Sequence, residues 1–198
     1  DTSFTGKDLL RTVLRSGNFG SSAFGGAGTV GLSTLEVAFQ EDAGANVVGV
    51  NRLFYQFPVG DSFIATAGAI VRQDDMLGVW PSAYPSDTVL DVFTYAGAPG
   101  AYNLALGSGA GLTWESDDFS ITANYLSSNA ESSNPETGGI ATNGAASNGL
   151  VQLAYAPENW GLAAAYNYSS GINGDGGLSA ANSTPAAGAP LGGFYNLG

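Results

Sequence analysis

The feature that most constrains the fold is a strict alternation of apolar and polar residues on both sides of short polar turns. In GAGLTWESDDFSITANYLSSN, residues 109 to 129, Leu112 and Trp114 alternate with Gly111 and Thr113 before such a turn. After it, one set holds Phe119, Ile121, Ala123 and Tyr125, and the opposite set holds Ser120, Thr122 and Asn124. Successive side chains leave a β-strand on opposite faces, so the pattern predicts two strands joined by a tight turn.

The same pattern recurs twice. GLVQLAYAPENWGLAAAYNYSSG, residues 149 to 171, alternates on both sides of a turn at 157–159. LFYQFPVGDSFIATAGAIVR, residues 53 to 72, turns at 58–61 but alternates less regularly, because Arg52 and Gln56 share a face with Phe54. A β-bulge near residues 47–57, or a register other than the one assumed, would explain this irregularity.

The connections between the expected strands alternate in length. Strands at about 47–57 and 62–72, 101–114 and 118–127, and 149–156 and 160–169 are joined tightly, whereas 73–100, 128–148 and 170–192 are long. Short turns at one end and long loops at the other are typical of a transmembrane β-barrel. The strand lengths suit tilted spans of about 9–11 residues better than the soluble average of about 5–6. A soluble β-sandwich, with the apolar residues in its core, is the alternative.

In a barrel, the apolar face of these strands meets lipid and the Ser/Thr/Gly/Asn face meets a water-filled lumen. Aromatic residues flank every short turn, where amphipathic rings are favoured at a membrane–water interface. The predicted interface aromatics are Phe57, Phe63, Trp114, Phe119, Tyr155 and Trp160.

Composition excludes several function classes. A net charge of −12 with only 5 Lys and Arg residues argues against nucleic acid as a partner. Cys and His are absent, which removes thiol chemistry, His-based triads and the usual transition-metal ligands. GAGTVG at 26–31 lacks the strand and helix of a dinucleotide site, and NGDG at 173–176 has one acid where a calcium loop needs several. We therefore expect no enzyme activity, metal or cofactor.

The five basic residues are candidates for a pore wall. Lys7, Arg11 and Arg15 share one face of segment 7–17 whether it is a helix or a strand, and Arg52 and Arg72 lie in expected strands. A cation facing lipid costs about 2–4 kcal/mol at the bilayer midplane, so these side chains should face the lumen or an interface. Segment 29–40, with Leu35, Val37 and Phe39 on one face, predicts a further strand.

The long segment 72–103 combines acidic and aromatic residues. Its acids are Asp74, Asp75, Asp87 and Asp91. Ser86 could cap a short helix over 87–96 that ends at Gly97. The segment has enough apolar surface to pack inside the barrel, where its acids would oppose the basic residues across a constriction; folding over the outer rim is the alternative. The polar stretches 128–148 and 170–192 are interpreted as exterior loops.

Three stretches resemble a known family. FTGKDLLRTVLRSGNF (4 to 19), LFYQFPVGD (53 to 61) and VRQDDMLGVWPSAYPSDTVLDVFTYAGAPGAYNL (71 to 104) are similar to cyanobacterial outer-membrane porins that carry an S-layer-homology domain. That group is placed with the carbohydrate-selective and iron-uptake porins. The likeness extends to about residue 170, and it implies a 16-stranded type of barrel, commonly trimeric, that passes ions and small solutes.

The sequence thus predicts an all-β, antiparallel transmembrane barrel portion. We expect residues 1–198 to form one porin domain of about eight strands, roughly half of a barrel, incomplete at both ends and without an S-layer-homology domain. The expected location is the outer membrane of a cyanobacterial cell, with lipid, ions including iron, small hydrophilic solutes and a homotrimer as partners. A secreted or surface β-domain that binds carbohydrate or a protein partner remains the alternative.

Overall fold

The chain forms a single antiparallel sheet in which each strand pairs with its neighbours in sequence. The computed structural model describes residues 1–20, 35–41, 43–90, 93–170 and 195–196. The strands are β1 (Leu9–Arg15), β2 (Gly49–Val59), β3 (Phe63–Arg72), β4 (Leu106–Ser116), β5 (Phe119–Ser127), β6 (Ser147–Tyr155), β7 (Leu162–Ser170) and the two-residue β8 (Tyr195–Asn196). They lie in the order β1 to β8 without a crossover. The all-β prediction is therefore confirmed.

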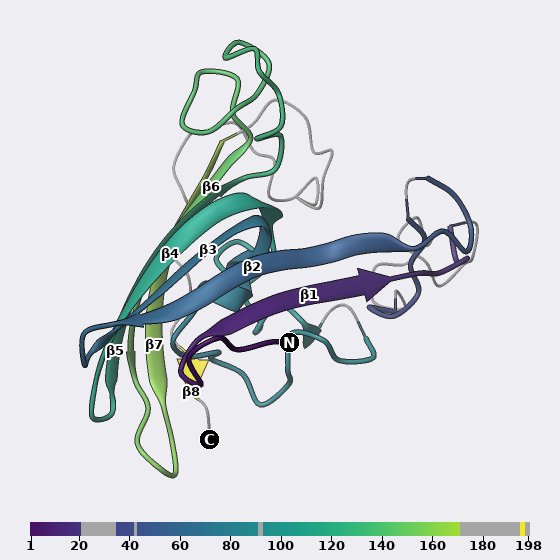
Figure 1. Cartoon of the computed structure of the whole chain (residues 1–198). Coiled ribbons are helices and arrows are strands. Elements are labelled where there is room, and N and C mark those ends of the chain that lie inside the picture. Colours follow the sequence, from purple (N-terminus) through teal and green to yellow (C-terminus); the bar gives the residue numbers. More distant parts are fainter. Residues whose placement is uncertain (21–34, 42, 91–92, 171–194, 197–198) are drawn as a thin grey trace.

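The connections alternate as the sequence predicts. Short turns join β2 to β3, β4 to β5 and β6 to β7 at one end of the sheet, which we call the short-turn end (Figure 1). Gly60 and Asp117 take positive φ in two of these turns, at 67° and 50°. At the opposite end, which we call the loop end, residues 128–146 form an ordered loop that stands above β5 and β6 in Figure 1.

The register is continuous except at bulges near the loop end of the first strands. Pairing shifts between Val13 and Leu14, between Leu53 and Phe54, and between Gly68 and Val71. The shift opposite Val13 and Leu14 leaves Asn51 of β2 without a partner, which places an extra residue in β2 where the sequence pattern is irregular. At Leu53 the residue without a partner is Ala69, in β3. Bulges increase local twist and bend a strand, and the sheet is strongly curved, with β1 and β2 running across the direction of β6 and β7 (Figure 1).

The segment between β3 and β4 packs against the polar face of the sheet. It begins with η1 (Gln73–Met76), a single 3-10 turn. Phe54, Val71, Met76, Ala105 and Leu126 form one buried cluster, against which Leu9 packs. A second cluster, farther along the sheet, contains Ala96, Ala101, Tyr102, Leu150 and Ala165. The hydrophobic core thus lies between one face of the sheet and this inserted segment, residues 73–105.

Three local predictions need correction, and one open alternative is decided. Residues 35–40 of the strand predicted at 29–40 form only an isolated bridge from Leu35 to Leu90 and a turn, and residues 29–34 lie outside the described residues. The helix predicted over 87–96 is not formed as an α-helix by its described residues, which make a bridge at Leu90, a 3-10 conformation at Phe93 and turns. The ambiguous segment 7–17 is a strand from Leu9, so Lys7 precedes it. The strand predicted from residue 101 begins at Leu106, since Leu104 has a φ of 54°, which interrupts extended backbone.

No helix among the described residues has the length and apolar character needed to cross a membrane.

Candidate functional site: a charged cleft beside the inserted segment

The two faces of β4–β7 have opposite character in the structure. Thr113, Thr122 and Gln152 are 5%, 0% and 1% exposed beneath the inserted segment. The intervening residues point away from it, and Ile121, Leu153 and Leu162 remain 45%, 53% and 45% exposed. A soluble sandwich would bury the second set between two sheets. Here the apolar face is the uncovered one.

Hydrogen bonds attach the inserted segment to the polar face. The backbone N–H of Gly78 donates to Thr122 Oγ1 (3.0 Å), and Asn124 Nδ2 donates to the carbonyl oxygen of Gln73 (3.3 Å). The side chain of Gln73 donates to Asn148 Oδ1 (2.9 Å), and Gln152 Nε2 donates to the hydroxyl of Tyr102 (2.9 Å). Buried polar side chains of this kind are costly unless paired, so these contacts fix the segment on the sheet.

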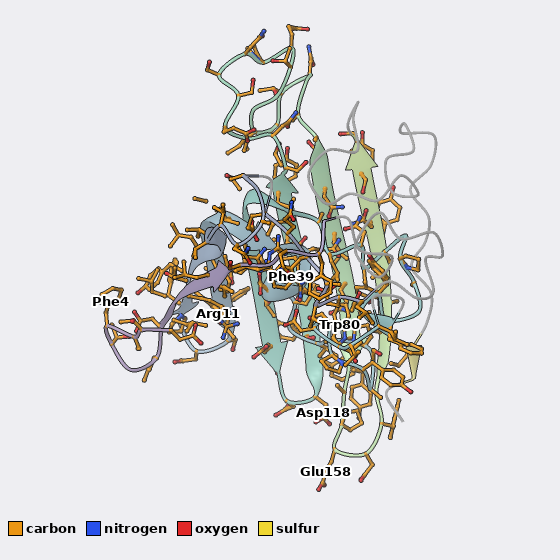
Figure 2. The ribbon with its side chains drawn as sticks, turned by 90° about the vertical axis from the view of Figure 1, so that its right-hand side faces the viewer. Phe4, Arg11, Phe39, Trp80, Asp118 and Glu158 are labelled. Carbon is orange, nitrogen blue, oxygen red and sulfur yellow. The ribbon has the colours of Figure 1, made fainter. Side chains whose placement is uncertain are left out.

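Glycines allow the segment to approach closely. A Cβ at Gly111 would lie 2.9 Å from the Cβ of Met76, and one at Gly78 would lie 2.7 Å from Cγ2 of Thr113. Both separations are shorter than van der Waals contact allows. The glycines on the predicted lumen face therefore include positions where a larger side chain would push the segment away. In Figure 2, Trp80 of this segment lies over the strands, while Asp118 and Glu158 mark the tips of two short turns.

A network of ion pairs connects the segment to β2 and β3. Arg52 Nε donates to Asp75 Oδ2 (2.7 Å), which also accepts the backbone N–H of Arg72 (2.9 Å). The guanidinium of Arg72 makes two bonds to Asp74 (2.6 and 2.8 Å) and reaches Asp87 (2.9 Å). Because Arg52 and Arg72 are only 6% and 8% exposed, these charges are held largely out of water.

The two neighbouring acids of η1 respond differently to this environment. Burial opposes ionisation of Asp74, but the hydrogen bonds and charge of Arg72 outweigh burial and hold the pKa of Asp74 below its ordinary value. Burial, and then the negative charge of Asp74, raises the pKa of Asp75 above its ordinary value. Two carboxyl groups that lie close together are expected to differ in pKa, because the negative charge of one disfavours ionisation of the other.

A cleft of about 540 Å³ opens beside this network at the loop end of the sheet. Its walls come from the ends of β1, β3 and β5, the starts of β2 and β4, and the first residues of the β5–β6 loop. The charged residues that line it are Arg15, Glu36, Glu41, Arg52, Arg72 and Glu131. Arg15 pairs with Glu41 (2.5 Å) and lies over the ring of Phe39, 4.7 Å from its centroid.

The structure brings some of the predicted basic residues together and separates others. Arg15, Arg52 and Arg72 line the cleft. Arg11 occupies the same face of β1 as Arg15 but pairs with Asp1 (2.9 Å) and lies over the ring of Phe54. Lys7 is exposed in the turn before β1. The cleft therefore contains three of the five predicted cations.

The predicted constriction acids are also divided. Asp74 and Asp75 lie in η1, and Asp87 contacts Arg72 with a side chain that is 78% exposed. Asp91 lies outside the described residues. The predicted opposition of acids and basic residues is therefore present as direct ion pairs between the segment and strands β2 and β3.

The predicted interface aromatics lie near one another at the short-turn end. Phe63 is directly opposite Trp114, and Phe119 is directly opposite Tyr155, with ring centroids 4.5 Å apart. Trp160 contacts Tyr155 edge to face (5.3 Å), and Phe57 stacks on Tyr55 (5.3 Å). These rings are on the uncovered face or at its edge, which produces an aromatic band across β2–β7.

Some residues of the site were not identified from the sequence. Glu36, Glu41 and Glu131 line the cleft from loops that are distant in sequence, and no local pattern points to them. Asp8 accepts hydrogen bonds from Ser3, Thr5 and Tyr55, which hold its pKa well below the ordinary range. Among the described residues, no group of three or more acidic, His or Cys side chains is arranged to hold a metal ion.

Comparisons with known proteins give one distant likeness. The chain is 28% identical over 171 residues to an uncharacterized protein of Synechocystis sp., a match that covers 85% of this chain and 30% of that protein. The chain thus spans less than a third of the length of this relative. No protein-family model matches the chain. No solved structure matches it either.

Proposed function

We propose that the chain is part of an outer-membrane porin through which ions and small hydrophilic solutes diffuse passively. The observation that carries this proposal is the inverted arrangement of the sheet, with an uncovered apolar face and a covered polar face. A membrane barrel has this polarity, because its outside meets hydrocarbon and its inside meets water. The aromatic band at the short-turn end supports the proposal, since such rings favour the lipid interface.

On this proposal, the inserted segment narrows the lumen and the charged cleft is the remaining passage beside it. Hydrogen bonds fasten the segment to β4–β7, and ion pairs fasten it to Arg52 of β2 and Arg72 of β3. Solutes would then pass through the cleft that opens beside these ion pairs at the loop end. Charged side chains at a narrow point act strongly on passing ions because little water separates them.

Closure of the barrel would need strands beyond those described. β1 pairs with β2, and β8 pairs with β7, with no pairing between β1 and β8 in the described part of the chain. We propose that further strands of a longer protein complete a barrel of about 16 strands, and that three such barrels associate. The relative comes from Synechocystis, and we propose the outer membrane of a cyanobacterial cell as the location.

The alternative is a secreted or surface β-domain that binds carbohydrate or a protein partner. The observation in its favour is an exposed aromatic pair on the inserted segment. Tyr84 and Phe93 stack with ring centroids 4.8 Å apart and are 53% and 42% exposed. Stacked rings at a surface suit the apolar face of a sugar or a partner side chain.

Two measurements on the full-length protein decide between these functions. A porin requires detergent for extraction from membranes and produces stepwise conductance in planar lipid bilayers. A binding domain stays in the aqueous phase and produces no conductance in the bilayer. Extraction without detergent, or the absence of conductance at protein amounts sufficient for insertion, would refute the porin proposal.

A further inference from the structure

The arginines of the cleft are all neutralised within the structure. Arg15 pairs with Glu41, Arg52 with Asp75, and Arg72 with Asp74, Asp87 and Glu36. An anion that entered the cleft would have to compete with a carboxylate already bonded to each guanidinium. The basic wall expected from the sequence therefore provides little net positive charge at this place.

The charges that line the cleft are equal in number, with Arg15, Arg52 and Arg72 beside Glu36, Glu41 and Glu131. Asp74, Asp75 and Asp87 do not line the cleft, but they pair with Arg52 and Arg72 from the inserted segment and leave its lining with an excess of negative charge. Glu131 is exposed on the β5–β6 loop and makes no ion pair with any described residue. Its charge is therefore the least compensated of those that line the cleft.

Buried polar atoms between the inserted segment and the sheet lie on the same face of the sheet, although none of them lines the cleft. Among the described residues, the buried side-chain atoms without a hydrogen-bond partner are Gln73 Oε1, Ser120 Oγ, Asn124 Oδ1 and Gln152 Oε1. Three of these are amide carbonyl oxygens, and the NH₂ group of each amide already donates to a partner. Carbonyl oxygens present negative potential and favour cations over anions.

We propose that this cleft passes small inorganic cations in preference to anions, and that Glu131 is a determinant of the preference. This inference rests on the proposed porin function. The neutralisation of every cleft arginine by a carboxylate and the uncompensated charge of Glu131 act in the same direction. Screening over about 8 Å at physiological salt leaves the charges that line the cleft effective within it.

The test is the reversal potential of the full-length protein in planar bilayers under a potassium chloride gradient. The wild-type protein should favour K⁺ over Cl⁻. Glu131→Gln should lower the permeability ratio about twofold, the effect of one unit charge acting over about 8 Å in water. Arg15→Gln should raise the ratio by a similar factor, because it leaves Glu41 unpaired.

Glu158→Gln is the matched control, because it removes the same charge from the tip of the β6–β7 turn, at the opposite end of the sheet (Figure 2). This variant should leave the ratio unchanged. A conducting wild-type channel that prefers Cl⁻, or equal effects of Glu131→Gln and Glu158→Gln, would overturn the inference and leave the porin function standing. A wild-type protein that does not conduct would refute both.

Discussion

The two faces of strands β4–β7 show how one alternating pattern supports two different kinds of burial. On the covered face, Thr122, Gln152 and Asn167 are at most 1% exposed; the first two make hydrogen bonds with the inserted segment, and Asn167 donates to Asn148 of the neighbouring strand. On the uncovered face, Val151 and Tyr166 are 53% and 46% exposed, and no described element packs over them. The polar side chains are thus buried by other parts of the protein, whereas the apolar side chains of the other face are not covered by protein.

This contrast means that the two faces should respond oppositely to substitution. A substitution on the covered face should lower stability according to the hydrogen bonds and ion pairs that it removes. A substitution on the uncovered face should change stability according to the medium, lipid or water, that this face contacts. The variants that test this contrast are made in the full-length protein.

The largest effect is expected at Arg72, on the covered side. Arg72→Gln leaves the buried carboxylate of Asp74 without its cation, and loss of one partner from a buried pair costs about 3–5 kcal/mol. Denaturant titration of the protein in detergent would measure this loss. Arg11→Gln is the control, since its pair with Asp1 is largely solvent-exposed and should be worth less than about 1 kcal/mol. Equal effects of the two variants would contradict the proposed role of the network.

The next prediction tests which medium the uncovered face meets. Val151 lies in the middle of β6 and is 53% exposed. Val151→Arg should destabilise the lipid-embedded protein by about 2–4 kcal/mol, because the charge would face hydrocarbon. At an exposed position of a water-soluble domain the same change should stay within about 0.5 kcal/mol. Unfolding measured in lipid vesicles distinguishes the two, and a near-zero effect would contradict the lipid-facing assignment.

A third prediction applies one chemical change to both faces. Tyr102→Phe removes the hydroxyl that accepts from Gln152 and should cost about 1–3 kcal/mol, because a buried N–H group loses its partner. Tyr168→Phe removes the same group from a side chain that is 45% exposed on the uncovered face. It should change stability by less than about 0.5 kcal/mol. Equilibrium unfolding measures both losses, and a larger loss of stability in Tyr168→Phe than in Tyr102→Phe would contradict this prediction.

The smallest effect is local and depends on pH. Hydrogen bonds from Ser3, Tyr55 and Thr5 lower the pKa of Asp8 in the folded protein below its unfolded value of about 3.9. The stabilisation is therefore present above pH 4 and is lost as the pH falls below that value. Asp8→Asn removes this dependence. Amide hydrogen exchange at Phe4 and Thr5 should accelerate in acid, relative to residues of β5, in the wild type but not in the variant. The same acceleration of exchange in the wild type and in Asp8→Asn would disprove this role of Asp8.

The strands could be predicted from the sequence more completely than the cleft. The hairpins around Asp117, Gly60 and residues 157–159 were predicted within a few residues, because alternation and turn residues are local properties. The irregularity in β2 was also visible, since Arg52 and Gln56 share a face with Phe54, and β2 has an extra residue at Asn51. The strand at 29–40 and the helix at 87–96 were wrong where the structure describes them. In both, an alternating pattern or a helix cap was present, but packing elsewhere decided the conformation.

The amino-acid sequence alone fixes the alternation of strand faces, the short turns with their aromatic flanks and the strongly acidic balance of charge. Which face is covered, and which carboxylate pairs with which arginine, depends on the tertiary structure. Glu36, Glu41 and Glu131 line one cleft with Arg15, Arg52 and Arg72 because five strands and the intervening loops converge there. Such contacts join residues that are distant along the chain, so a local sequence pattern does not predict them. Strand periodicity is fixed by backbone geometry, whereas the partners of a charge are fixed by how the whole sheet curves.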